Sequence, residues 1–192
     1  MRAAWQALLA HLRRLALVEQ GAAAVEFALI LPIMLLVYIG SVEASLAISM
    51  DRRVQSVAGA LGDLVARSDT AVTTAALEDY FQAAGGIMTP YSTETLKQVV
   101  TQVRVNAAGT AATVVWSRQY VNDTLSTGTD HPANSSFELP EAMRAIAAGS
   151  YVIVSEGSYA HTPITGFVFD QPINLYRENF LMPRFGGSIS IN

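Results

Sequence analysis

The sequence has no cysteine among its 192 residues, which excludes disulfides, thiolate catalysis and cysteine-based zinc sites. Histidine is almost as scarce, because only His11, His131 and His161 are present. No HExxH, GxSxG or phosphate-cradling glycine pattern accompanies them. We therefore interpret His131 as part of a solvated loop and His161 as a strand-end residue. The sequence predicts no catalytic residue, no metal site and no cofactor, and so a protein that is not an enzyme.

Charge is also sparse, since Asp, Glu, Lys and Arg together make up 15% of the chain and the formal net charge is -4. Residues 1–21 hold three Arg and one Glu, a net charge of +2, so the rest of the chain carries -6. An acidic main portion argues against nucleic acid as a partner.

One long stretch has no charge at all. Sixteen consecutive uncharged residues separate Glu26 from Glu43, and residues 22–42 form an apolar run interrupted only by Glu26. As a helix, that run would be about 31 Å long, which matches the hydrocarbon core of a bilayer. The sequence therefore predicts a transmembrane helix over residues 22–43.

The charges that flank this helix predict its orientation. Arg2, Arg13 and Arg14 precede it, whereas the other side begins with Glu43 and a nearly balanced Asp51, Arg52 and Arg53. The positive-inside rule places the N-terminus in the cytoplasm and the residues beyond about 45 on the other side of the membrane. Residues 1–21 fit either an amphipathic helix on the membrane surface or a charged leader without structure of its own.

The helical period continues beyond the apolar run. An apolar stripe with spacings of three and four residues predicts an amphipathic continuation over residues 44–67, ending near Ala66; its members are Leu46, Met50, Val54, Val57, Leu61 and Leu64. Such a stripe requires a partner surface in the rest of the protein.

Residues 68–192 have the pattern of a small α+β domain. We expect a helix over residues 74–84 with Thr74 as N-cap, and a hairpin of strands 97–106 and 112–121 with one buried face. Further expectations are an exposed, mobile loop over residues 121–136, a short helix opened by Pro140, and up to three strands in residues 151–163, 164–169 and 174–183. Tyr151, Tyr159, Phe167 and Phe169 are interpreted as strand-core residues.

Together these segments predict a fold in the α+β class. A long N-terminal transmembrane and amphipathic helix packs on a small antiparallel β-sheet domain that carries short helices.

Glu26 is the residue that calls for an explanation, because carboxylates in membrane spans are rare and usually functional. Gly21 lies five positions before it, Phe27 follows it, and a basic leader precedes both. A tolerated interfacial charge would account for the glutamate alone, though not for this arrangement.

The stretch from Glu19 to Arg53 resembles type IV pilin-like proteins, and most closely the TadE-like pseudopilins of the tight-adherence (Flp) pilus. The resemblance rests on Gly21, the sequence AAAV and Glu26-Phe27, then Leu31-Pro32 within the span and a second acidic residue at Glu43. SYAHTPI at residues 158–164 and MPR at residues 182–184 resemble the family more loosely. The chain departs from the family pattern in lacking a basic residue at positions 45–47.

The resemblance implies a minor pilin or pseudopilin that a prepilin peptidase cuts between Gly21 and Ala22. It further implies assembly roles for Glu26, Phe27 and Glu43, and as partners the peptidase, other pilin and pseudopilin subunits, the inner-membrane assembly platform and membrane lipid. Glu26 would then pair with the new amine on Ala22 of its own or a neighbouring subunit, because an unpaired charge in an apolar environment is costly.

Three alternatives remain open at this point. One is an uncleaved, single-span periplasmic binding domain, and another is a pseudopilin of a type II secretion system. The third is a secreted protein cut by ordinary signal peptidase near Ala47-Ile48-Ser49, for which the signal would be unusually long.

Overall fold

A computed structural model describes residues 22–166 and 170–192 of the chain. Contacts divide these described residues into two compact parts: residues 22–45 with 164–166 and 170, and residues 46–163 with 171–192. The predicted leader, Gly21 and the two interpreted core residues Phe167 and Phe169 lie outside the described residues. The α+β fold class is confirmed.

The long helix α2 runs without interruption over Ala22–Ala66, as the sequence predicts. Pro32 lies inside it, and its missing N–H removes one backbone hydrogen bond without ending the helix. Alanine, leucine, isoleucine and valine dominate its first half, where an all-round apolar surface is typical of a helix that crosses a membrane. The second half has the amphipathic pattern of a helix on a folded domain.

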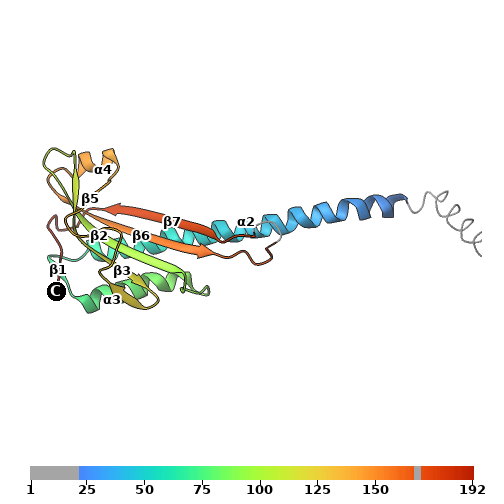
Figure 1. Cartoon of the computed structure of the whole chain (residues 1–192), viewed down its shortest axis with the longest axis horizontal. Coiled ribbons are helices and arrows are strands. Elements are labelled where there is room, and N and C mark those ends of the chain that lie inside the picture. The colour runs from blue at the N-terminus through green and yellow to red at the C-terminus, as the bar shows by residue number, and fades with distance from the viewer. Residues whose placement is uncertain (1–21, 167–169) are drawn as a thin grey trace, which may run out of the picture. The chain divides into compact units, whose positions relative to one another are not determined.

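The main sheet is antiparallel, with strand order β4-β3-β2-β6-β7 and β5 paired to β3 (Figure 1). Its long strands are β2 (Leu96–Val105), β3 (Ala112–Val121), β6 (Tyr151–His161) and β7 (Ile173–Leu181). The short ones are β4 (Thr124–Ser126) and β5 (Ser136–Phe137). The predicted hairpin of β2 and β3 is confirmed, and its register shifts by one residue between Gln102 and Val103 because β3 carries a bulge there.

The apolar stripe of α2 packs on this sheet. Met50, Val54, Val57 and Leu61 are completely buried, in one cluster with residues of the helix α3 and of strands β2, β3 and β6. Two glycines allow α2 to lie close to strand β6. A Cβ on Gly157 of β6 would lie 3.2 Å from Val54 Cγ1, and a Cβ on Gly62 of α2 would lie 2.5 Å from Ser155 Oγ. Ser155 Oγ donates a hydrogen bond of 2.7 Å to the Ala58 carbonyl.

The prediction that β2 has one buried face is wrong. Val103 and Val105 belong to a second cluster, with Leu139 and Ala147, while Val100 belongs to the cluster under α2. Gln98 and Gln102, which the alternation places toward water, are 2% and 0% exposed on the face under the helices. Both faces of the sheet are covered, so the buried polar side chains of β2 form hydrogen bonds with other groups inside the protein.

The remaining elements are short. Helix α3 spans Thr74–Gly85, and its N-cap is Thr73 rather than the predicted Thr74, since Thr73 Oγ1 accepts from the Ala76 N–H at 3.1 Å. The 3₁₀ turn η2 (Gly86–Met88) follows it, and α4 spans Glu141–Ile146 after Pro140. Strands β1 (Ala71–Val72) and β8 (Ser190–Ile191) form a separate parallel pair that the local sequence pattern does not predict.

Two predicted segments differ from the structure. Residues 121–136 are no free loop, because they contain β4 and lead into β5, and Asn134 and Ser135 exchange backbone hydrogen bonds with Val114 of β3. Residues 164–166 form a bend instead of the start of a strand. Pro163 lacks a backbone N–H and Gly166 has a φ of 65°, so neither fits the hydrogen-bond ladder of a β-sheet.

Candidate functional site

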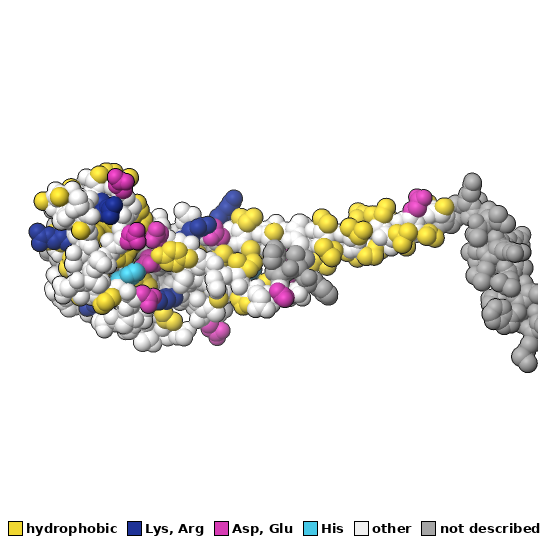
Figure 2. Space-filling model, turned by 45° about the horizontal axis from the view of Figure 1, so that its top comes forward, with side chains coloured by type: hydrophobic (Ala, Val, Ile, Leu, Met, Phe, Trp, Pro, Cys, Tyr) yellow, Lys and Arg dark blue, Asp and Glu magenta, His cyan; other side chains and the backbone are white. Residues whose placement is uncertain are grey.

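The first half of α2 exposes its apolar side chains on all faces. Most large hydrophobic residues between Val25 and Val42 are more than half exposed, including Phe27 at 57% and Leu29 at 71% (Figure 2). The helix is long and apolar enough to cross a membrane, and none of its most apolar stretch is buried within the protein. A core helix of a water-soluble protein would be mostly buried, so this surface favours a membrane anchor.

Glu26 lies in this exposed segment, four residues after Ala22, the first described residue of α2. Four helical residues advance the chain by about 6 Å and by slightly more than one turn, so both lie on nearly the same side of the helix. An amine on Ala22 would therefore be within reach of the Glu26 carboxylate. Gly21, the predicted processing residue, lies outside the described residues.

Glu43 has a different environment, because its side chain is only 4% exposed. Its Oε1 accepts a 3.0 Å hydrogen bond from the Thr165 backbone N–H and a second one from the Thr165 hydroxyl. Both belong to the same compact part of the chain, although 122 positions separate them in sequence. The sequence singles out Glu43 but carries no signal that would identify Thr165 as its partner.

The structure does not bring the predicted residues together into one cluster. Glu26 and Glu43 are 17 residues apart on one helix, a distance of about 26 Å along its axis. Ala22, Glu26, Phe27 and Glu43 are a linear series along α2. Such a series suits contacts with membrane and neighbouring helices rather than the binding of one small molecule.

Sequence reasoning missed a polar cluster on the outer face of the sheet. Glu156 on β6 is 8% exposed, and its two carboxylate oxygens lie 2.6 Å from the Tyr176 hydroxyl and 3.0 Å from His131 Nε2. Burial and the Glu156 carboxylate together raise the pKa of Tyr176.

Asp130, next to His131, forms an ion pair with Lys97 at 2.9 Å, and Lys97 lowers the pKa of this aspartate. The alternation of β6 could have indicated the burial of Glu156, because it places this residue on the same face as the apolar Val152 and Val154.

This cluster attaches residues 127–135 to the sheet, so His131 is not the solvated loop residue that the sequence predicts. Its side chain is 28% exposed and its ring lies 4.8 Å from the ring of Phe137. Within the described ranges, no group of three acidic, histidine or cysteine side chains is arranged to hold a metal ion. The role that the geometry supports is structural.

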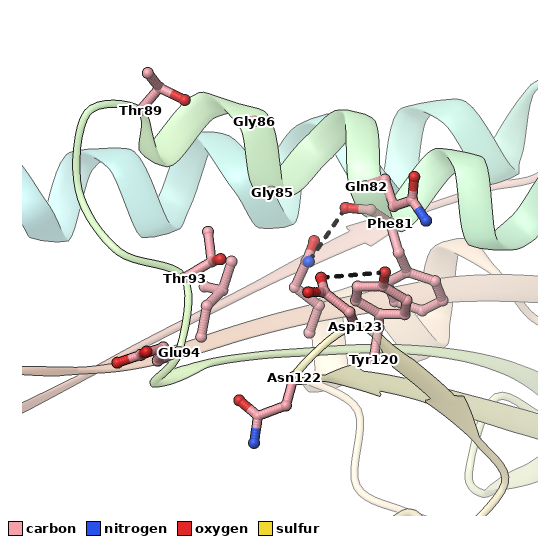
Figure 3. Close-up of a pocket in the computed structure, with 12 residues that line it drawn as sticks. Phe81, Gln82, Gly85, Gly86, Thr89, Thr93, Glu94, Tyr120, Asn122 and Asp123 are labelled. Atoms are coloured by element: carbon pink, nitrogen blue, oxygen red, sulfur yellow. Dashed lines mark hydrogen bonds between the residues drawn. The ribbon is translucent and has the colours of Figure 1, made fainter.

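A cavity of about 910 Å³ opens between the end of α3 and the turn that joins β3 to β4 (Figure 3). Phe81 and Tyr120 stack at its base, with ring centroids 5.5 Å apart, and the Tyr120 hydroxyl lies 3.5 Å from Asp123. Burial is the main cause that raises the pKa of Tyr120. Arg53 of α2 supports the rim by donating to the Ile87 and Thr89 carbonyls at 2.7 and 2.9 Å. The described residues that line the cavity include no histidine, lysine or serine.

Comparison with protein-family models gives a match to the family described as TadE-like protein, over residues 21–60. Residues 21–60 of this chain are TadE-like. The match begins at Gly21, and it includes Glu26, Phe27 and Glu43. Neither the curated proteins nor the solved structures gave a match.

The TadE-like segment covers the exposed half of α2 and most of the stripe that packs on the sheet. The TadE-like family is associated with pilus components in general, and the match covers less than half of this chain. The sheet, the polar cluster and the cavity lie outside the matched residues.

Proposed function

We propose that this protein is a minor pilin or pseudopilin of a tight-adherence pilus, made with a cytoplasmic leader of residues 1–21 that prepilin peptidase removes after Gly21. The observation that carries the proposal is the TadE-like match, which begins at this glycine and continues through Glu26 and Glu43. The exposed apolar surface of α2 supports it, because a pilin helix must fit first into a membrane and then among other helices.

Cleavage changes the electrostatics of the anchor. It removes a leader of net charge +2 and creates an α-amino group on Ala22, one helical turn from the Glu26 carboxylate. In an apolar environment the two charges stabilise each other, whether they belong to one subunit or to neighbours. Phe27 and the aliphatic residues after it supply the packing surface, so the pairing sets the register in which helices associate.

The folded part of the chain favours a low-copy role. Residues 68–192 follow α2 and form a sheet of six strands with short helices. A domain of this size on every subunit would crowd a thin filament, so initiation of assembly, a tip position or a link to the assembly platform suits it better. The partners proposed are the peptidase, other pilin and pseudopilin subunits, the platform and lipid.

The N-terminal residue of the protein recovered from membranes tests this proposal. Intact mass and terminal sequencing should give a chain that begins at Ala22 when the host has its prepilin peptidase, and at Met1 when it lacks the enzyme. Gly21→Trp should block the cut and leave the whole leader attached, whereas Gln20→Ala should not. An intact Met1 in both hosts would contradict processing and favour an uncleaved anchor.

A further inference from the structure

The bend between β6 and β7 is held against the anchor helix by a pair of hydrogen bonds. Thr165 donates two hydrogen bonds to Glu43 Oε1, from its backbone N–H and from its hydroxyl. Glu43 directly follows the apolar run 22–42, whose length as a helix matches the thickness of a bilayer. The hydrogen bonds therefore fix residues 164–166 beside the position where α2 would leave the hydrocarbon core.

The carboxylate depends on these donors. Glu43 is 4% exposed, and an ionised carboxylate removed from water is stable only when hydrogen bonds replace its hydration. A backbone N–H and a hydroxyl on one residue provide two of them with little conformational freedom. The contact is therefore expected to hold the bend in a defined place rather than to form at random.

The residue next to this contact is unusually exposed for its type. Ile164 is 76% exposed, the highest value among the large hydrophobic side chains of the described residues. A lone exposed isoleucine is unremarkable on a water-soluble surface, but this one adjoins the end of an exposed apolar helix surface that runs from Val25 to Val42. Ile164 and that surface belong to the same compact part of the chain.

We propose that residues 164–166 are a membrane-contact element, in which Ile164 enters the headgroup region of the bilayer while the Glu43–Thr165 contact holds the bend beside the anchor. The occupant of this surface is lipid, because the Glu43–Thr165 contact holds Ile164 at the end of the exposed apolar segment of α2 that is proposed to cross the membrane. The inference rests on the membrane anchor of the proposed function, and on neither cleavage nor assembly.

The lack of cysteine makes a direct test possible in the full chain, since a single introduced thiol can be labelled selectively. An environment-sensitive fluorophore is attached in three separate variants, Ile164→Cys, Leu36→Cys within the span, and Ile146→Cys on α4. Leu36 is 60% exposed and Ile146 is 72% exposed, so all three positions accept a label. Each protein is reconstituted in vesicles of phosphatidylethanolamine and phosphatidylglycerol that contain nitroxide lipids.

We expect nitroxides near the headgroup to quench the label at position 164 about threefold more strongly than the label at position 146. The label at position 36 should be quenched best by nitroxides deep in the acyl chains. Thr165→Val, which keeps the shape of the side chain but removes the hydroxyl donor, should lower the quenching at position 164. Thr162→Val is the control and should not.

The outcomes separate the two proposals. Equal quenching at positions 164 and 146, with position 36 quenched, would overturn the membrane-contact element and leave the anchor standing. No quenching at position 36 would overturn both. Protection of position 164 that depends on protein concentration instead of nitroxide lipid would indicate a second copy as the occupant, and would contradict the proposal. An unchanged signal in Thr165→Val would contradict the role of the Glu43 contact.

Discussion

Single residues determine how closely α2 can approach the sheet. Gly62 is buried, and a Cβ there would lie 2.5 Å from Ser155 Oγ and 2.6 Å from Leu181 Cδ1. Ser155 cannot move without loss of its hydrogen bond to the Ala58 carbonyl. Gly59, one helical turn earlier, has more room, since its nearest neighbour would be Asn179 Nδ2 at 3.8 Å.

These two glycines give a matched pair of variants. Gly62→Ala should lower the free energy of unfolding by about 1–3 kcal/mol, because the added methyl group overpacks the helix–sheet contact. Gly59→Ala should leave it unchanged or raise it by up to about 1 kcal/mol, because alanine favours a helix. Thermal and denaturant unfolding of the purified chain in detergent, followed by circular dichroism, measures both. Equal destabilisation by the two changes would contradict the packing account.

At the scale of elements, the C-terminal segment is joined to the end of α2. The Arg184 N–H donates to the Ala66 carbonyl at 2.9 Å, which satisfies one of the free carbonyls at the helix end. Asp63 forms ion pairs with Arg67 and with Arg184. The hydrogen bonds from Arg67 and Arg184 lower the pKa of Asp63 below 3.8.

This shift predicts a dependence of stability on pH. A lowered pKa in the folded state means that the pairing stabilises the fold above the unfolded pKa, near 3.8, and that the contribution is lost as pH falls through the folded pKa. Asp63→Asn should therefore destabilise the protein at pH 7 by about 0.2–1 kcal/mol, a typical value for exposed pairs. The difference from wild type should shrink as pH falls below 4. A difference that stays constant between pH 7 and pH 3 would contradict the pairing.

The elements differ in how far the sequence predicts them. The bounds of α2 and the hairpin of β2 and β3 follow from local periodicity, because both helix and strand repeat their apolar residues within a few positions. The burial of Gln102 does not follow, since its partners, Ser188 Oγ at 2.7 Å and the Ile189 N–H at 2.8 Å, are 86 and 87 residues away.

The same limit applies to the candidate site. Gly21, Glu26 and Glu43 stand out in the sequence, because a glycine and two carboxylates flank or interrupt an apolar run. A pattern of this kind is visible within a short stretch of sequence. Thr165 and Ile164 carry no such signal, and their importance comes from contact with a residue 122 positions away. The sequence misplaces His131 for a similar reason, because its partner Glu156 is on another strand.

At the scale of the whole molecule, Glu26 is expected to act between subunits. Glu26→Val should leave removal of the leader intact, because the peptidase cuts at the glycine, but should abolish or strongly reduce the pili on cells. Loss of a charge partner in an apolar interface costs about 3–5 kcal/mol, enough to prevent stable incorporation. Mature mass and surface pili are measured in the same strains, and Glu78→Val, on α3, serves as the control. Wild-type piliation in Glu26→Val would contradict the pairing role.

The position of Ile189 has a consequence for truncation of the chain. Ile189 is completely buried in the main cluster, its carbonyl accepts from Trp116 Nε1 at 2.6 Å, and its N–H donates to Gln102 Oε1 at 2.8 Å. A variant cut before residue 189 would keep every long strand but would leave the Trp116 indole N–H and the Gln102 carbonyl oxygen without these partners. Residues 189–192 therefore close the core instead of trailing from it.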